Sequence, residues 1–377
     1  MSGLESKSSV LAIVAMSVAA VLVFSLLPII SGAAAERFGL NTEQVGLVAF
    51  YYFVPYAVVS ASARLWIDRI SWRLARTVGF TLMLAGLSVA IAADSFDLMS
   101  GGMALVAAGA ALLFPICMTA SALHSNPNRI FAIRLTAEQM VPAILLISVT
   151  LVLGGVIEFE KLFGLMVGII VVTGLLSIGL TAGAAGTTAA PAKGEPGRVN
   201  FPALLALSLN FAGYAALWAF FERVGAHRGF DAGFIALWLS VALVTAGLGP
   251  LVAMALESSP IRNRLGVGAT LVVIVCMVWL GQSAEPAVYA ISLSIIPMAY
   301  GVTLVFLLSS VAAADPEGKS AALMPFALAV AAAVGPLMFG YLWAAGQPVI
   351  LISAAGILVG AWWLLVHHAP APVEIRV

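Results

Sequence analysis

The sequence predicts an all-α membrane protein in which twelve transmembrane helices form two pseudo-symmetric six-helix bundles. Three observations predict this fold class. Of the 377 residues, 62% are hydrophobic and only 9% are charged, whereas a soluble domain carries about 25% charged residues. Apolar runs of about 20 residues, the length that crosses a bilayer, follow one another along the chain. Short patterns from the first half then recur in the second half.

Twelve apolar runs are long enough to span a bilayer, and the short polar turns between them favour antiparallel neighbouring helices. The first run is longer than the core of a signal peptide, which has about 7–15 residues, so we expect it to remain as a helix. In chain order the runs cover about residues 9–35, 44–63, 77–93, 98–123, 130–157 and 162–183, and then 202–221, 232–256, 265–284, 287–313, 320–345 and 348–366.

The recurring patterns keep a nearly constant offset, which indicates a duplicated bundle. Two parallel copies of one bundle are typical of transporters, because the halves can rock about a site between them. The longest polar stretch separates spans six and seven, so we expect one bundle in residues 1–185, a cytoplasmic linker in 186–200 and a second bundle in 201–377. The matching patterns are Glu36-Arg37-Phe38-Gly39 with Glu222-Arg223-Val224-Gly225, Asp68 and Arg73 with Glu257 and Arg262, and Asn126-Pro127 with Asp315-Pro316.

The positions of the basic residues predict the orientation in the membrane. With the N-terminus in the cytoplasm, 13 of the 17 Lys and Arg residues fall at the inner face, as the positive-inside rule requires. We therefore expect an integral, multi-pass protein of a bacterial inner (cytoplasmic) membrane with both termini cytoplasmic. The inner residues are Lys7, Arg64, Arg69, Arg73, Arg76, Arg129, Arg134, Lys193, Arg198, Arg262, Arg264, Lys319 and Arg376.

The loop between spans two and three, residues 64–73, reads Arg-Leu-Trp-Ile-Asp-Arg-Ile-Ser-Trp-Arg. It resembles the loop signature of the major facilitator superfamily, Gly-x-x-x-Asp-Arg-x-Gly-x-Arg. Asp68, Arg69 and Arg73 match that signature, whereas Arg64 and Ser71 replace its two glycines. Together with the twelve spans in two halves, the resemblance covers the whole chain. It implies the fold of that superfamily and transport by alternating access.

The resemblance also implies a cytoplasmic gate formed by Asp68, Arg69 and Arg73. In the family the aspartate faces the N-terminal end of helix eleven, which here lies near Lys319 and Ser320. A carboxylate is favoured at a helix N-terminus by the helix dipole. In the alternative interpretation, the basic residues of this loop only enforce the topology.

Glu138 is the one carboxylate well inside a predicted span. A charge at mid-membrane costs about 2.5–3.5 kcal/mol or more, so the position of Glu138 requires an explanation. In one hypothesis Glu138 takes and releases the coupling proton, because removal from water favours the neutral form of a carboxyl group. In the other, Arg134, four residues earlier on the same helical face, forms a structural ion pair with Glu138 near the cytoplasmic interface.

The two Glu-Arg-x-Gly turns close spans one and seven at the predicted outer face. They predict a symmetric outer gate, or a path for protons, formed by Glu36, Arg37, Glu222 and Arg223. The alternative is that these residues anchor the helices at the interface, with Gly39 and Gly225 as C-terminal caps.

Neutral polar and aromatic residues within the spans predict a substrate cavity. The resemblance implies that helices one, four, seven and ten line it, with two, five, eight and eleven beside them, and that three, six, nine and twelve face lipid. The spacing of four puts Asn210, Tyr214 and Trp218 on one helical face. Mid-membrane aromatic residues are also common as packing residues, which is the alternative. The candidates are Tyr51, Tyr52, Tyr56, Gln139, Asn210, Tyr214, Trp218, Trp238, Tyr300 and Thr303.

These patterns predict a secondary active transporter of a small organic solute, and the resemblance to the major facilitator superfamily implies that it is coupled to protons. The phosphate-binding loop Gly-x-x-x-x-Gly-Lys-Ser/Thr is missing, so a gradient must supply the energy. The four histidines fall at or beyond the ends of spans, which argues against an intramembrane enzyme. Two alternatives stay open: an uncoupled facilitator, and a non-transporting assembly or sensor protein on the same scaffold.

The composition also limits the partners. The formal net charge is zero, so nothing indicates a nucleic-acid partner. Cys117 and Cys276 lie within apolar spans without metal-ligand spacing, and we expect neither a metal nor a cofactor. No Lys or Arg lies deep in a cavity-lining span, so we expect a neutral, aromatic or weakly acidic solute. The expected partners are this solute, protons and lipid, and the expected oligomeric state is a monomer.

Overall fold

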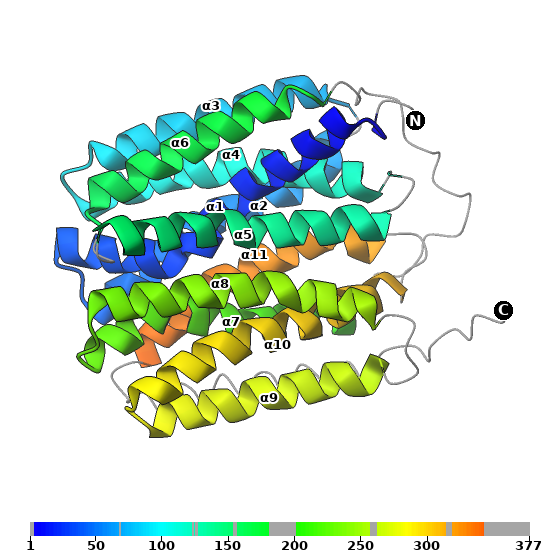
Figure 1. Cartoon of the computed structure of the whole chain (residues 1–377). Helices are drawn as coiled ribbons and strands as arrows, with labels where there is room; N and C mark the ends of the chain where they lie inside the picture. Colours follow the sequence, from blue (N-terminus) through cyan, green and yellow to red (C-terminus); the bar gives the residue numbers. More distant parts are fainter. Residues whose placement is uncertain are drawn as a thin grey trace.

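The structure is a computed structural model of the 377-residue chain, and its described residues are 4–67, 69–122, 124, 127–153, 157–180, 201–256, 262–313 and 319–342. The predicted linker, the predicted twelfth span and Asp68 lie outside the described residues. Over the described parts the chain forms eleven α-helices (Figure 1). They are α1 (Lys7–Phe38), α2 (Thr42–Trp66), α3 (Trp72–Ile91), α4 (Phe96–Ala122), α5 (Pro127–Leu153), α6 (Phe159–Ser177), α7 (Phe201–His227), α8 (Ala232–Ala255), α9 (Arg262–Gln282), α10 (Pro286–Ala313) and α11 (Lys319–Leu342).

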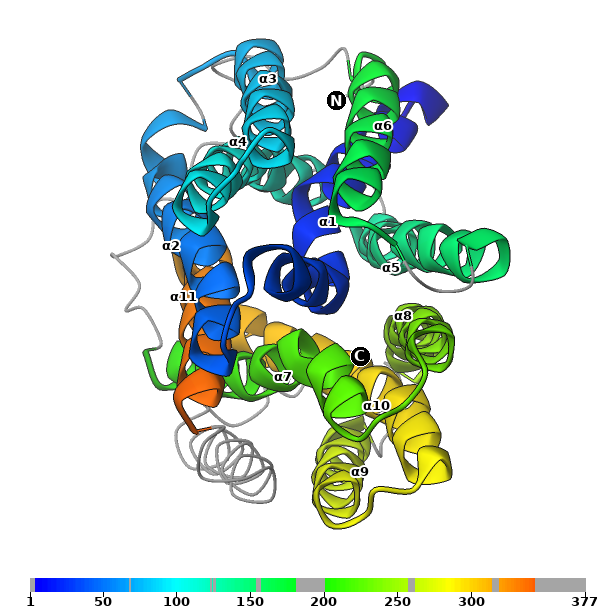
Figure 2. The same cartoon turned by 90° about the vertical axis from the view of Figure 1, so that its left-hand side faces the viewer.

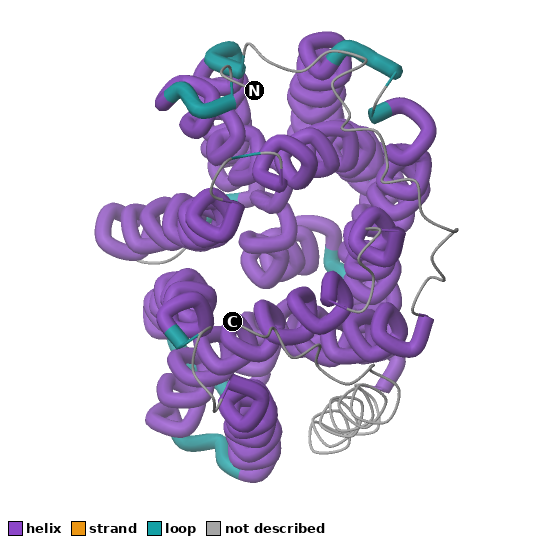
Figure 3. The backbone as a smooth tube through the Cα atoms, turned by 90° about the vertical axis from the view of Figure 1, so that its right-hand side faces the viewer, coloured by secondary structure: helices purple, strands orange, loops and turns teal. Residues whose placement is uncertain are grey.

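The helices confirm the predicted fold class. Ten of the eleven described helices are long and apolar enough to cross a membrane. The eleventh, α5, carries Arg134 and Glu138 in its first half. Among the described residues no strand occurs, and short loops join neighbouring helices (Figure 3).

Polar contacts at the helix ends show that α6 runs antiparallel to α1, whereas α3 runs parallel to α1. We call the end of the bundle where α1 begins the proximal end, and the end where α1 finishes the distal end. At the proximal end Ser9 of α1 donates a hydrogen bond to the carbonyl of Gly179, beyond the end of α6 (3.4 Å). At the distal end Arg37 of α1 donates to the carbonyl of Ala93, after α3 (3.1 Å), and pairs with Glu160 at the start of α6.

The helix α6 ends earlier than expected. The apolar run predicted a span to residue 183, but α6 ends at Ser177. There Arg76 of α3 donates to the carbonyl of Ser177 (2.7 Å), and Ser9 donates to that of Gly179. In a longer helix these carbonyl groups would accept from backbone N–H groups of the next turn. Here the two side chains donate to them instead, so the helix can end within the apolar run.

The first two helices have strong local signals at their ends. Ser6 caps α1, and its hydroxyl accepts the backbone N–H of Ser9 (3.2 Å). Asn41 and Gln44 form a reciprocal capping box at the start of α2. Gly39 ends α1 with a positive φ of 62°, which confirms it as a C-terminal cap.

The alternative interpretation of the repeated turns also made Gly225 the C-terminal cap of α7, and for Gly225 it is wrong. The helix runs on to His227, and Gly229 adopts the positive φ, 75°. A Cβ atom at Gly225 would lie 2.8 Å from Cγ1 of Ile235 and 3.1 Å from the Tyr289 hydroxyl. The glycine therefore allows α8 and α10 to pack closely on α7, so the repeated turn has different roles in the two halves.

Helices α1–α6 form one half of the bundle and α7–α11 belong to the other (Figure 2). The halves meet where α2 packs on α11, α5 on α8 and α1 on α7. Exchange of the halves converts the α2–α11 contact into the α8–α5 contact, as pseudo-symmetry requires. In the spanning windows of α1 and α7, 72% of residues are buried, against 33% for α6 and α9. Helices α1 and α7 are therefore central, and α6 and α9 are peripheral.

Candidate functional site

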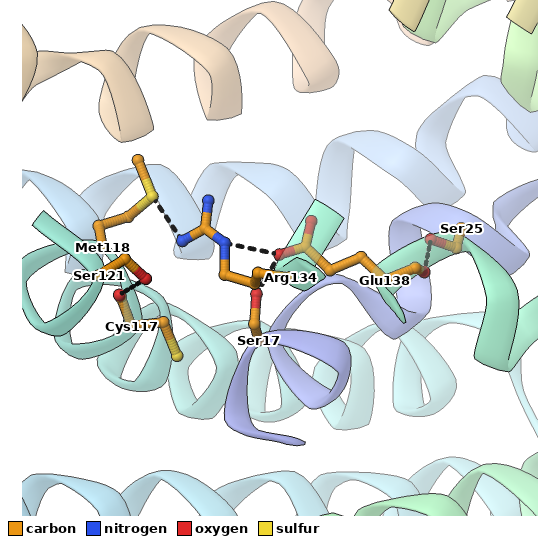
Figure 4. Close-up of polar contacts among 7 residues, drawn as sticks. All are labelled: Ser17, Ser25, Cys117, Met118, Ser121, Arg134 and Glu138. Atoms are coloured by element: carbon orange, nitrogen blue, oxygen red, sulfur yellow. Dashed lines mark hydrogen bonds and ion pairs between the residues drawn. The ribbon is translucent and has the colours of Figure 1, made fainter. Parts of the chain in front are cut away.

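A buried ion pair lies in the first half of α5 (Figure 4). Nε of Arg134 is 3.1 Å from Oε1 of Glu138, and the two residues are 3% and 4% exposed. Among the described residues, they are the only buried Asp, Glu, Lys or Arg side chains. Four residues separate them, so one helical turn brings their side chains together.

Two serines of α1 complete the surroundings of Glu138. The hydroxyl of Ser17 donates to the same carboxylate oxygen, Oε1, that contacts Arg134. The hydroxyl of Ser25 donates to the backbone carbonyl of Glu138 (3.3 Å), four residues before Pro142, whose ring replaces the usual N–H donor. Sequence reasoning missed both serines. Their spacing of eight, about two helical turns, puts them on one face of α1, and this was the available signal.

The guanidinium group of Arg134 also contacts α4. One of its terminal nitrogens lies 2.8 Å from the sulfur of Met118, and the group lies over the Phe114 ring, 5.4 Å from its centroid. One turn of α4 later, Ser121 donates to the carbonyl of Cys117 (2.7 Å), and the Cys117 thiol is free and buried. The ion pair thus joins α1, α4 and α5 within the first half.

A second cluster, of aromatic residues, lies on α7 and α10. The rings of Tyr214 and Tyr300 stack at 3.7 Å between centroids, with an interplanar angle of 3°. Trp218 lies beyond Tyr214 at 6.2 Å, nearly parallel to it. The predicted face of Asn210, Tyr214 and Trp218 therefore packs as an aromatic surface, to which α10 adds Tyr300.

This aromatic cluster crosses the boundary between the two halves. Phe24 of α1 stacks on Phe211 of α7 at 5.3 Å, and Phe211 lies 6.4 Å from the Tyr300 ring. The indole N–H of Trp218 donates to the backbone carbonyl of Phe24 (2.9 Å). In an α-helix a carbonyl group usually accepts from the backbone N–H of the residue four positions later. For Phe24 that residue is Pro28, which has no N–H. Trp218 therefore satisfies a carbonyl that a proline leaves free.

Three buried polar side chains near the middle of their helices have no protein hydrogen-bond partner among the described residues. Asn210 is fully buried, and neither its amide nitrogen nor its amide oxygen has a hydrogen-bond partner among the described residues. The same holds for the hydroxyl groups of Tyr52 and Tyr300. Leaving such a group unpaired costs about 1–3 kcal/mol. Water or a bound solute can remove that cost.

The other predicted cavity residues are scattered. Tyr56 is buried on α2, within electrostatic range of Arg134 and Glu138. Tyr51, by contrast, is 39% exposed and packs its ring on Phe96 (6.0 Å). Of these two tyrosines of α2, therefore, Tyr56 lies toward the ion pair and Tyr51 does not.

Three further candidates lie on other helix contacts. Gln139 faces α8, because a Cβ atom built at Gly247 of α8 would lie 3.4 Å from the Cβ atom of Gln139. The ring of Trp238 lies 6.3 Å from that of Phe234, one turn earlier in α8. The hydroxyl of Thr303 lies 3.2 Å from that of Thr270 in α9, within the second half.

The two Glu-Arg-x-Gly turns differ in their contacts at the distal end. Arg37 pairs with Glu160 and lies 5.0 Å from the Phe159 ring centroid, so it holds α1 to α6 inside the first half. Glu36, Glu222 and Arg223 instead line one pocket between the halves. The predicted outer cluster is therefore partly assembled, without Arg37.

The residues of the predicted cytoplasmic gate lie at the proximal end. Arg69 and Arg73 are exposed, in and after the turn between α2 and α3. Asp68 lies outside the described residues. Within the described parts of the chain, no group of three or more His, Cys, Asp or Glu residues could hold a metal ion.

Two repeated halves of membrane helices that meet around buried polar and aromatic side chains are typical of membrane transport proteins. A family model described as the Major Facilitator Superfamily matches residues 11–336. The chain therefore belongs to the Major Facilitator Superfamily, whose fold and family relationships are those of transporters and not of enzymes.

Solved structures share this fold at low sequence identity. The transporter FucP, in an outward conformation, is 16% identical, with a TM-score of 0.67 over 98% of this chain and 100% of that one. The human organic anion transporter MFSD10 (TETRAN) is 13% identical, with a TM-score of 0.71 over 96% and 100% of the two chains. No curated protein sequence matches the chain.

Proposed function

We propose that this protein is a secondary active transporter that moves a small organic solute by alternating access and is driven by protons. The observation that carries the proposal is the buried carboxylate of Glu138, which contacts both Arg134 and α1. Buried ionisable residues within membrane spans typically mark ion paths and proton relays.

The contacts of Glu138 suggest how a proton changes the bundle. In its charged form Glu138 uses one oxygen both for the ion pair with Arg134 and to accept the hydrogen bond from Ser17. A proton on the carboxyl group removes the charge attraction and leaves the Arg134 guanidinium to another acceptor. A proton can shift the equilibrium between two arrangements only if it binds them unequally. Because α1 and α5 both lie against the second half, a change at this pair reaches the contact between the halves.

The aromatic cluster supports a neutral, aromatic or weakly acidic substrate. Transport pockets of this kind are mostly apolar, with a few placed polar groups. Tyr214, Tyr300 and Trp218 supply aromatic surface, and Asn210 supplies an amide with both atoms free of protein partners among the described residues. We propose that these residues contact the solute.

The experiment begins with a ligand-stabilisation screen of purified protein, followed by transport of a hit in liposomes. We expect the unmodified protein to accumulate the solute when a proton gradient is imposed. Glu138→Gln abolishes accumulation, because glutamine cannot exchange a proton. Since this single change removes the carboxylate partner of Arg134, the double variant Arg134→Gln/Glu138→Gln provides a second test in which neither charge of the pair is buried. Glu43→Gln, an exposed carboxylate at the start of α2, is the matched control.

Two results decide the role of Glu138. Loss of accumulation with retained counterflow in the double variant supports proton coupling through this residue. Accumulation against the gradient by either glutamine variant contradicts it.

An uncoupled facilitator is the second candidate function. It is favoured by the contacts with Arg134 and Ser17, which satisfy Glu138 as a purely structural ion pair would. A facilitator equilibrates the solute across the liposome membrane but never accumulates it. Whether the unmodified protein accumulates the solute in the liposome experiment therefore distinguishes the two functions.

The proposal also includes an orientation. We propose that the proximal end faces the cytoplasm of a bacterial cell, with the protein acting as a monomer in the inner membrane. In this orientation the exposed residues Arg69, Arg73 and Arg264 face the cytoplasm. Labelling of single cysteines at these positions in intact cells and in inverted vesicles tests it, because only the vesicles should react with an impermeant reagent.

A further inference from the structure

A pocket of about 410 Å³ opens between the two halves at the distal end. It lies between α1 of the first half and α7 and α8 of the second, which are neighbours in the view of this end (Figure 2). Its wall includes the apolar residues Ile29, Phe230 and Ile235. Its charged residues are Glu36, Glu222 and Arg223. This pocket shares no residue with the ion pair or the aromatic cluster described above.

The charges of the pocket are not paired with one another. Glu36, Glu222 and Arg223 form no ion pair among the described residues. One carboxylate oxygen of Glu222, Oε2, is buried and has no hydrogen-bond partner within the described chain. Arg37, the neighbour of Glu36, is bound to Glu160 instead. The lining thus contains two carboxyl groups and one guanidinium group, so acidic groups outnumber basic ones in the pocket.

The carboxylate of Glu222 also reaches across the boundary between the halves. A Cβ atom at Gly32 of α1 would lie 2.7 Å from Cδ of Glu222. The side chain therefore rests on the backbone of the opposite half, close to Glu36, which follows Gly32 by one helical turn. A ligand that contacts both carboxylates contacts both halves.

We propose that this distal pocket binds a small amphipathic amine. Its ammonium group donates to the free oxygen of Glu222 and lies near Glu36, since charge-assisted hydrogen bonds are the stronger ones. Its apolar part packs on Ile29 and Ile235, and the Phe230 ring offers a further surface for a cation. Because the amine bridges α1 and α7, it stabilises the arrangement in which the distal ends of the halves are together.

Binding is tested with phenethylamine and purified full-length protein in a non-ionic detergent, by calorimetric titration. The control ligand is 2-phenylethanol, which has nearly the same shape without the charge. We expect the alcohol to bind at least about tenfold more weakly. Glu222→Gln keeps the shape of the side chain and should weaken phenethylamine binding by a similar factor. Glu43→Gln, an exposed distal carboxylate outside the pocket, should leave binding unchanged.

Glu36→Gln provides a second variant if Glu222→Gln fails to fold, because Glu36 is exposed. We expect a severalfold loss of phenethylamine affinity in this variant. Equal binding of amine and alcohol, or unchanged amine affinity in the glutamine variants, would overturn the proposal.

The effect on the two halves is measured with spin labels at Asp94 and Ala284, in the distal loops after α3 and α9. The native Cys117 and Cys276 are replaced by alanine. Phenethylamine should shift the distance distribution toward the shorter separation, and 2-phenylethanol should not. Amine binding without any shift would contradict the bridging role. Neither measurement requires transport, so these outcomes are independent of the transport assay.

Discussion

At Glu138 one carboxylate oxygen forms an ion pair with Arg134 of α5 and accepts a hydrogen bond from Ser17 of α1. Burial of either charge alone is costly, whereas the pair with its hydroxyl partner offsets that cost. The same contacts make the site sensitive to a single proton. The same geometry is therefore compatible with a structural role and with a coupling role for Glu138. The two roles differ only in whether Glu138 exchanges a proton during transport.

The pairing itself has a measurable consequence for stability. Arg134→Gln leaves the Glu138 charge buried without its partner, and we expect a loss of about 3–5 kcal/mol in the free energy of unfolding. The double variant Arg134→Gln/Glu138→Gln removes both charges and should be more stable than the single one. Thermal unfolding of the purified variants in one detergent measures this order. A double variant less stable than the single variant would contradict the account of the pair.

Sequence reasoning found part of this site for a physical reason. Spacing of four along one helix predicted the contact between Arg134 and Glu138 and the shared face of Asn210, Tyr214 and Trp218. Contacts between helices depend on how each helix is rotated about its axis. In a membrane, apolar residues surround the whole helix, so the sequence contains little signal for that rotation. Thr303 thus pairs with Thr270, and Tyr51 lies at the exposed side of α2.

Among the elements, α2 and α11 bring their backbones close together at the distal contact between the halves. A Cβ atom at Gly46 would lie 2.8 Å from the carbonyl oxygen of Pro336, and one at Gly340 would lie 3.1 Å from that of Thr42. These neighbours are backbone atoms, which cannot rotate away as a side chain does. The glycines therefore allow the distal ends of the two helices to touch.

Gly46→Val is expected to separate the distal ends, because its side chain cannot fit against the α11 backbone. Spin labels at Asp94 and Ala284 should report a longer mean distance than in the unmodified protein. Gly101→Val is the matched control, since a Cβ atom at Gly101 of α4 meets no atom within 4 Å. An unchanged distance in Gly46→Val would show that this contact does not hold the distal end closed.

At the scale of the whole molecule, hydropathy predicted the fold class, and the described helices confirm it. The contacts between the halves agree with the repeat, because exchange of the bundles relates the α2–α11 and α5–α8 contacts. The repeat did not predict the differences between its copies. Arg37 binds within its own half, whereas Glu222 crosses to the other, and α7 extends past the glycine that matches the α1 cap. These differences arise from tertiary neighbours that the two sequence patterns do not share.

The central claim is that the two halves rock about α1 and α7, so that opening one end closes the other. It is tested by measuring two distances in separate samples of Gly46→Val and of the unmodified protein. One label pair is at the distal positions Asp94 and Ala284, and the other is at the proximal positions Arg69 and Arg264. We predict that the distal distance lengthens and the proximal distance shortens together. A longer distal distance with an unchanged proximal distance would contradict alternating access in this protein.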